Sequence, residues 1–170
     1  GEAFDAPVRP LGGSEQLALS PDGYWLAYTS RKLSGKAEAV STNSDIYLYS
    51  IREGKTTNLS AGLGGYDIEP VFSPDGGRVA WLSMATPGFE SDRNGIIVHD
   101  LKTGQHEDIT KGSELSAANV RWSADGKTIY FVAVVEGTEQ LFSIPSKGGK
   151  IKQLTKGLQN YNSFELAGPD

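Results

Sequence analysis

The chain has 170 residues, a net charge of −5 and no cysteine, so disulfides, thiolate catalysis and cysteine-ligated zinc are excluded. Hydrophobic residues make up 38% and charged residues 22% of the sequence, which is typical of a folded globular protein and not of a disordered one. Lys and Arg are scattered and no apolar stretch is long enough to cross a bilayer, so we expect neither nucleic acid nor a membrane as the main partner.

The first 13 residues hold several Pro and Gly and are interpreted as a lead-in, or as the outer strand of a preceding repeat over residues 6–11. Four predicted strands follow, at residues 15–20, 24–29, 45–51 and 56–60. The turn Ser20-Pro21-Asp22-Gly23 joins the first two, because Ser, Pro and Gly suit the first, second and fourth positions of a type I turn. The polar segment 31–44 has no strand or helix period and is predicted to be a loop.

The same order of elements recurs twice. The second unit has predicted strands at residues 69–73, 78–83, 95–101 and 105–110, with a long loop at 84–94. The third unit has them at 118–123, 128–135, 139–144 and 150–155. The turn motif returns at Ser73 and Ser123, after 53 and 50 residues, and a fourth copy begins at Gly168. Three aromatic residues share one aligned position and are expected to be buried: Tyr28, Trp81 and Phe131.

A repeat of four strands at this spacing is typical of a β-propeller blade. Residues 46–49 are apolar on both faces of their strand, which indicates a sheet covered on both sides. We therefore predict an all-β fold, a partial β-propeller of four-stranded antiparallel blades with three full blades plus the start of a fourth. The predicted boundaries are a lead-in at 1–13, blades at 14–60, 61–110 and 111–155, and the first strand of a truncated next blade at 156–170.

The chain begins at Gly1 without Met, carries no signal peptide and stops inside a repeat, so we expect it to be a piece of a longer protein. Three blades and part of a fourth cannot close a ring. Apolar blade faces at both ends are therefore expected to be exposed and to favour self-association.

Residues with catalytic or metal-binding potential are few. No Gly-x-Ser-x-Gly motif occurs, and the turn serines have no histidine nearby in sequence to act as a base. If the tight turn pairs Lys102 with Gln105, His99 lies opposite Asp108 and not opposite His106, so a shared metal is not expected and both histidines are interpreted as surface or edge residues. The turn aspartates lack the clustered pattern of a calcium loop. We predict no catalytic residue, no metal and no cofactor in this chain.

The two long loops are predicted to share one face. In a four-stranded meander, the second–third and fourth–first connections lie at the same end of the sheet, and both long loops are second–third connections. We therefore expect this face to contact substrate or another domain. Glu90, Asp92 and Arg93 are the candidate residues, since a carboxylate suits a substrate amine and an arginine suits a carbonyl or carboxylate. The alternative is that they are solvated or hold the domain interface.

The chain resembles the β-propeller of the prolyl oligopeptidase family, in particular bacterial dipeptidyl-peptidase and acylaminoacyl-peptidase-like members. The resemblance rests on the repeated turns and on residues 41–49, 65–76 and 80–84. It implies a propeller that gates a C-terminal α/β-hydrolase domain carrying a Ser, Asp and His triad outside this chain, with peptides as substrates and this chain alone inactive. Some dipeptidyl-peptidase IV-like members anchor the substrate amine with a Glu-Glu pair, and this sequence contains none.

A second class of function stays open. The turn motif is shared with TolB-like propellers, so the alternative is a non-catalytic, TolB-like scaffold that binds proteins. A propeller-type sugar lyase is a weaker third option, because it needs a histidine-based metal site that two separated histidines do not suggest. The resemblance to bacterial members favours a periplasmic or secreted location, with the cytoplasm as the alternative.

Overall fold

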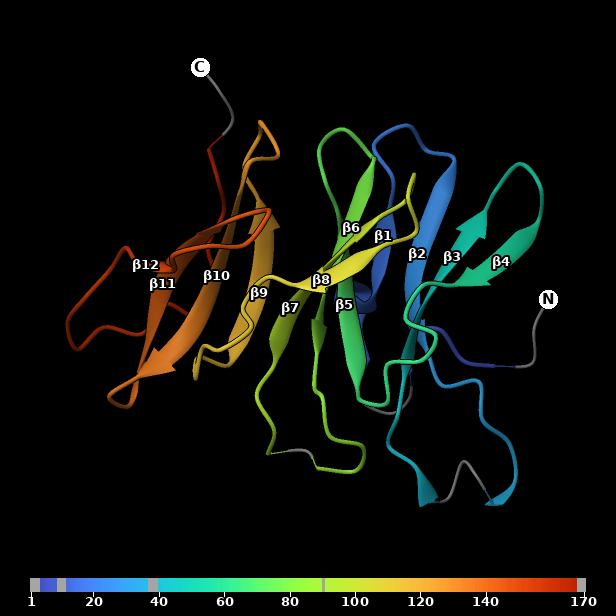
Figure 1. Ribbon diagram of the computed structural model, residues 1–170, viewed down its shortest axis with the longest axis horizontal. Coiled ribbons are helices and arrows are strands. Elements are labelled where there is room, and N and C mark those ends of the chain that lie inside the picture. Colours follow the sequence, from blue (N-terminus) through green and yellow to red (C-terminus); the bar gives the residue numbers. More distant parts are fainter. Residues whose placement is uncertain (1–3, 9–11, 37–39, 90, 168–170) are drawn as a thin grey trace.

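The computed structural model describes residues 4–8, 12–36, 40–89 and 91–167. Within them, three four-stranded antiparallel sheets follow one another along the chain (Figure 1). The strands of the first sheet are β1 (Leu17–Leu19), β2 (Trp25–Ser30), β3 (Asp45–Ser50) and β4 (Lys55–Asn58). Those of the second are β5 (Asp67–Phe72), β6 (Arg78–Ser83), β7 (Gly95–Asp100) and β8 (His106–Asp108). Those of the third are β9 (Ala117–Trp122), β10 (Thr128–Val135), β11 (Thr138–Pro145) and β12 (Lys152–Gln153).

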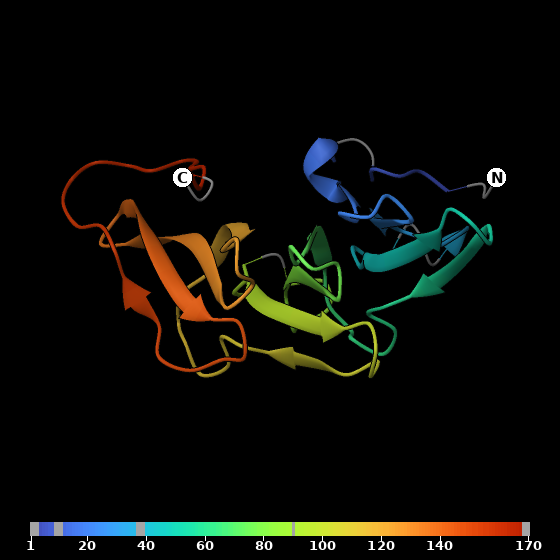
Figure 2. The same ribbon diagram turned by 90° about the horizontal axis from the view of Figure 1, so that it is seen from above.

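Each sheet is a simple meander, with strands paired in the order of the sequence. Seen from above, the three sheets stand side by side along an arc, and β4, β8 and β12 lie on its outer rim (Figure 2). This is the arrangement of propeller blades around a common axis. The prediction of an all-β, partial β-propeller is confirmed.

The repeated turn has one hydrogen-bond pattern in all three sheets. In the second sheet, Gly76 N donates to Ser73 O at 2.8 Å, and the Ser73 hydroxyl donates to Asp75 Oδ1 at 2.5 Å while accepting from Arg78 N at 2.9 Å. Asp75 Oδ1 also accepts from Gly77 N at 3.0 Å. Gly76 has φ of +71°, the left-handed conformation that follows a type I turn in a hairpin and that glycine adopts without strain. The Ser and Asp side chains thus satisfy the polar groups that the turn leaves unpaired.

A second repeated contact closes the outer end of each sheet. A hydroxyl just after the fourth strand accepts a hydrogen bond from a backbone N–H of the third strand. The three pairs are Ser60 with Ile46 N, Thr110 with Ile96 N and Thr155 with Leu141 N, at 3.0, 3.0 and 2.9 Å. Because β4, β8 and β12 are short, this contact extends the pairing beyond the last strand bond.

The core lies between adjacent sheets. One cluster fills the space between the first and second sheets and includes Leu48, Val79 and Trp81, and a larger one between the second and third includes Ile96 and Phe131. Tyr28, Trp81 and Phe131 are 9%, 0% and 0% exposed, so the prediction that they are buried is confirmed.

Some predicted elements are absent or changed. The expected strand over 156–170 is wrong for residues 156–167, which form none, while 168–170 lie outside the described residues. This segment instead bonds back to the third sheet, with Tyr161 N donating to Glu139 O at 3.1 Å, and a strand needs a neighbour that continues the ladder. Residues 6–8 of the alternative outer strand form none either, and residues 9–11 lie outside the described residues.

Some of the described residues have helical conformation where none was predicted. Ser14–Gln16 form a 3-10 turn, η1, where the sequence predicts the start of a strand. Lys36 and Val40, in the segment predicted to be a loop, have helical conformation. Among the described residues, no helix is long and apolar enough to cross a membrane.

Candidate functional site

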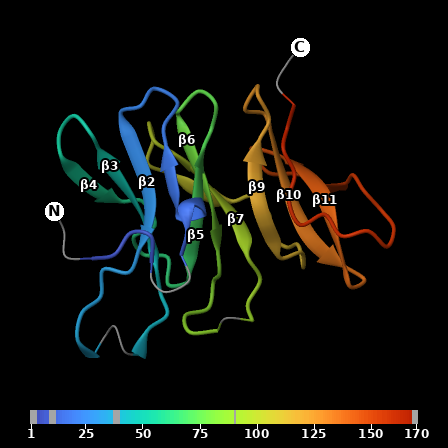
Figure 3. The same cartoon turned by 180° about the vertical axis from the view of Figure 1, so that it is seen from behind.

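The two long loops leave the same end of the molecule, opposite the Ser-x-Asp-Gly turns (Figures 1 and 3). Their bases meet at the start of β5. Asp67 N donates to Ser44 O at 3.0 Å, at the end of the first loop, and Met84 N donates to Tyr66 O at 3.1 Å, at the start of the second. Gly65 fits here because a Cβ would lie 1.4 Å from Met84 O. The topology therefore brings both loops to one junction.

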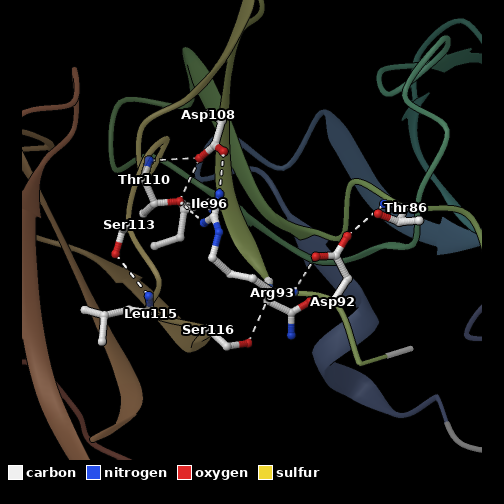
Figure 4. Close-up of polar contacts among 10 residues, drawn as sticks. Thr86, Asp92, Arg93, Ile96, Asp108, Thr110, Ser113, Leu115 and Ser116 are labelled. Carbon is white, nitrogen blue, oxygen red and sulfur yellow. Dashed lines mark hydrogen bonds and ion pairs between the residues drawn. The ribbon is translucent and has the colours of Figure 1, made fainter. Parts of the chain in front are cut away.

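Asp92 folds the second loop onto itself (Figure 4). Its Oδ2 accepts from Thr86 N at 2.9 Å and its Oδ1 from Arg93 N at 2.8 Å. The pKa of the Asp92 carboxyl lies below its ordinary value. The main cause is a hydrogen bond from the Thr86 side chain, and the two backbone N–H groups act in the same direction. Asp92 is thus a charged carboxylate that organises its own loop.

Arg93 turns toward the second sheet (Figure 4). Its Nη2 lies 3.0 Å from Asp108 Oδ2 and its Nη1 donates to Thr110 Oγ1 at 3.0 Å. The Thr110 hydroxyl in turn donates to Asp108 Oδ1 at 2.7 Å. Both charged side chains are 26% exposed. The guanidinium is therefore occupied by the sheet, which favours the interpretation of Arg93 as a residue that holds structure.

The sequence prediction grouped three residues at this site. Asp92 and Arg93 are neighbours on the loop, but their side chains contact different partners. Glu90 lies outside the described residues. The assignment of these residues to substrate or domain contact stays a prediction.

Asp67 is the residue that sequence reasoning missed. It is fully buried, and its Oδ1 accepts from Trp81 Nε1 at 3.0 Å. The pKa of its carboxyl is raised to about 6, mainly by burial and further by the nearby charge of Asp45. One signal was present in the sequence: the aligned position 50 residues later is Ala117, so a carboxylate replaces a small apolar residue.

The inner strands β5 and β9 carry a repeated backbone irregularity. Glu69 and Asn119 have φ of 56° and 53°, uncommon for residues other than glycine, and each lies where the strand register shifts. Burial and the neighbouring Glu15 raise the pKa of Glu69, while Arg121 acts in the opposite direction. The turn motifs gave no indication of these bulges.

The predicted register of the two histidines is wrong. His99 pairs with His106 and not with Asp108, and their rings stack with centroids 6.2 Å apart. The hairpin loop is wider than predicted, because Asp100 N bonds Gln105 O and the Asp100 side chain accepts from Lys102 N and Thr103 N. His99 is also buried, at 7% exposure, beside Trp81 and not at the surface. Among the described residues, no three His, Asp or Glu side chains are grouped to hold a metal ion.

Three four-stranded meanders along an arc, two apolar cores between neighbouring sheets and hairpin turns of one geometry define this chain as a segment of a β-propeller. It is 43% identical over 166 residues, 98% of its length, to dipeptidyl-peptidase 5 of Porphyromonas gingivalis, and 44% identical over 168 residues to that of Porphyromonas endodontalis. It spans 24% of the length of each of these curated relatives. The chain is thus a β-propeller segment that is similar to about a quarter of the length of these two dipeptidyl-peptidase 5 proteins.

Among solved structures, TolB from Acinetobacter baumannii superposes with a TM-score of 0.60 and 25% identity, over 82% of this chain and 32% of that one. No family model matches the sequence.

Proposed function

We propose that the longer protein to which this chain corresponds is a serine-type dipeptidyl-peptidase, and that the chain is part of the propeller that controls access to its catalytic domain. The observation that carries this proposal is the 43% identity to dipeptidyl-peptidase 5 over nearly the whole chain. The described residues hold no nucleophile paired with a base, so bond cleavage is assigned to an α/β-hydrolase domain outside this segment.

The propeller acts on substrate entry and orientation. A ring of blades over an active site admits short or unfolded chains and excludes folded proteins, which changes access more than the chemical step. The face with the loops at 31–44 and 84–94 is the one that we assign to the catalytic domain or the substrate entrance, because the opposite end carries the tight Ser-x-Asp-Gly turns. For the location we propose the periplasm or the extracellular space, with the cytoplasm as the alternative.

The second candidate is a TolB-like scaffold that binds proteins without catalysis. It is favoured by one observation, the superposition on TolB at 25% identity. The higher identity and fuller coverage of the peptidase matches favour the peptidase.

The test compares this chain with the longer protein, using dipeptide nitroanilides with free and with acylated amino termini. We expect the chain alone to give background hydrolysis, and the longer protein to cleave only the free-amine substrates in a reaction that a serine-directed inhibitor stops. Cleavage only of the acylated substrates would replace the dipeptidyl-peptidase with an acylaminoacyl-peptidase. No turnover by the longer protein, together with capture of a protein partner, would decide for the scaffold.

A further inference from the structure

Asp67 lies at the seam between the first and second sheets, where the bases of both long loops join. Its backbone makes two hydrogen bonds with Ser44: Asp67 N donates to Ser44 O at 3.0 Å, and the Ser44 hydroxyl donates to Asp67 O at 2.8 Å. The preceding residue, Tyr66, pairs with Ser44 in a parallel bridge and accepts from Met84 N. A change at Asp67 therefore reaches residue 44, which ends one loop, and residue 84, which begins the other.

The Asp67 carboxylate is incompletely bonded. Oδ1 has the Trp81 indole as its donor, but Oδ2 is buried and has no hydrogen-bond partner in the described part of the chain. The Ser83 and Ser60 hydroxyls lie close enough to favour the charged form, and burial outweighs them. An ionised carboxylate with a buried, unpaired oxygen is unfavourable, whereas the protonated acid gains a donor that can reach these hydroxyls.

The charges around Asp67 increase this cost. Asp45 acts on it from β3 as a like charge, while Trp81 and Ser83 on β6 and Ser60 after β4 are neutral. Glu69 lies two residues further along β5, and the charges of Glu15 and Arg121 act on Glu69. Among the described residues, no cation is found that interacts with the ionised Asp67 carboxylate. Hydration by water is therefore what can stabilise the ionised form.

We propose that Asp67 is a pH-dependent latch at the base of the two long loops: the protonated acid closes the seam between the first and second sheets, and ionisation opens it to water. The raised pKa of about 6 places the midpoint of this change near pH 6. The inference concerns the fold of this segment and stands whether or not the longer protein is a peptidase. If it is, the loops that face the entrance are held tightly in acid and loosely in base.

Hydrogen exchange of single amides tests the latch, because the two seams contain matched amides. Asp67 N bonds Ser44 O at the first seam, and Ala117 N bonds Asn94 O at 2.9 Å at the second. After correction for intrinsic exchange, we expect protection of the Asp67 and Met84 amides to fall between pH 5 and pH 8, by at most about 10-fold if opening restores the ordinary pKa of the carboxyl. Protection of the Ala117 amide should not change.

Two variants assign the effect. Asp67→Asn keeps an acceptor for Trp81 and removes the titration, so the protection of Met84 should become independent of pH. Asp45→Asn removes the like charge, so the midpoint should move to lower pH, and it serves as the test if Asp67→Asn does not fold. The proposal is overturned if the first seam shows no pH dependence, if Ala117 changes in parallel, or if the dependence persists in Asp67→Asn.

Discussion

The two seams between neighbouring sheets share a backbone plan and differ in chemistry. At both, the first residue of an inner strand donates its N–H to the residue that ends a long loop: Asp67 to Ser44 and Ala117 to Asn94, at 3.0 and 2.9 Å. At the first seam, Asp67 accepts a hydrogen bond from the fully buried Trp81, and at the second, the aligned residues Ala117 and Phe131 belong to one buried apolar cluster. The backbone hydrogen bond is common to both seams. The side chains differ together: Asp67 and Trp81 at the first seam correspond to Ala117 and Phe131 at the second.

The pairing has a physical reason. A buried indole N–H costs free energy unless it has an acceptor, and Asp67 supplies that acceptor. Phenylalanine has no polar group, so alanine suffices opposite it. The second seam gains extra polar contacts elsewhere, from Arg78, which bonds Ser146 Oγ at 3.0 Å and Gly126 O at 2.7 Å and covers the Trp122 ring. One seam is therefore joined through a buried acid and the other through apolar packing and a surface arginine.

The largest expected effect comes from converting the first seam to the chemistry of the second. Trp81→Phe should lower the free energy of unfolding by about 2–4 kcal/mol, because it leaves a cavity and takes the donor from a buried carboxylate. Adding Asp67→Ala should recover part of this loss. Urea denaturation of both single variants and the double variant at pH 8 measures the coupling. Strictly additive losses would show that the two residues do not act as a pair.

The second effect is the pH dependence of stability. The pKa of Asp67 is raised to about 6 in the folded state, so the folded protein binds the proton more tightly than the unfolded chain. Its contribution is most favourable below about pH 4 and is lost as pH rises through about 6. The shift from 3.8 corresponds to an upper limit of about 3 kcal/mol.

Asp67→Asn should remove this dependence, so the variant should be more stable than the parent at pH 8 and similar to it at pH 4.5. Thermal unfolding across that range checks the difference. The turn aspartates serve as a control, because their pH dependence has the opposite sign. The pKa of Asp75 is lowered, mainly by the hydrogen bond from the Ser73 hydroxyl, so the contribution of Asp75 to stability is lost as pH falls. A parent whose relative stability rises from pH 4.5 to 8 would contradict the assignment to Asp67.

The repeats and the burial pattern could be predicted from the sequence because they depend on local rules. Ser, Asp and Gly fix each turn through contacts within six residues, and aromatic residues eight positions after each turn serine are buried. The hairpin register at His99 could not be predicted, since side-chain bonds of Asp100 widen the loop. The start of a strand without a neighbour was wrong because strand pairing is not a local property.

The candidate site was less accessible from the sequence. Loop topology correctly grouped the two long connections at one end, but charged residues on a loop do not reveal whether they face solvent or the sheet. Arg93 finds Asp108 only after β7 and β8 pair. Asp67 becomes unusual only when Trp81 and Ser44 enclose it.

A smaller effect separates the turn of the second sheet from that of the third. Ser73→Ala should cost about 1–2 kcal/mol, because it leaves Arg78 N without its side-chain acceptor at a fully buried position. Ser123→Ala removes the same bond to Thr128 N at a more exposed position, so water can replace it and the cost should be lower. Denaturant midpoints of the two variants test this order, and equal losses would contradict it.

The smallest expected effect concerns Arg93, which could hold the loop or contact substrate. The Arg93 guanidinium bonds Asp108 and Thr110 at once. Because a quarter of each charged side chain remains exposed, the ion pair should stabilise the fold by about 1 kcal/mol or less. If Arg93 only holds the loop against the second sheet, Arg93→Ala and Asp108→Asn should destabilise the longer protein equally and change kcat/KM on short peptides by similar, small factors. If it binds substrate, Arg93→Ala should raise KM while Asp108→Asn, which frees the guanidinium, should not. Because both variants break the same contact, a kinetic difference between them would overturn the structural assignment.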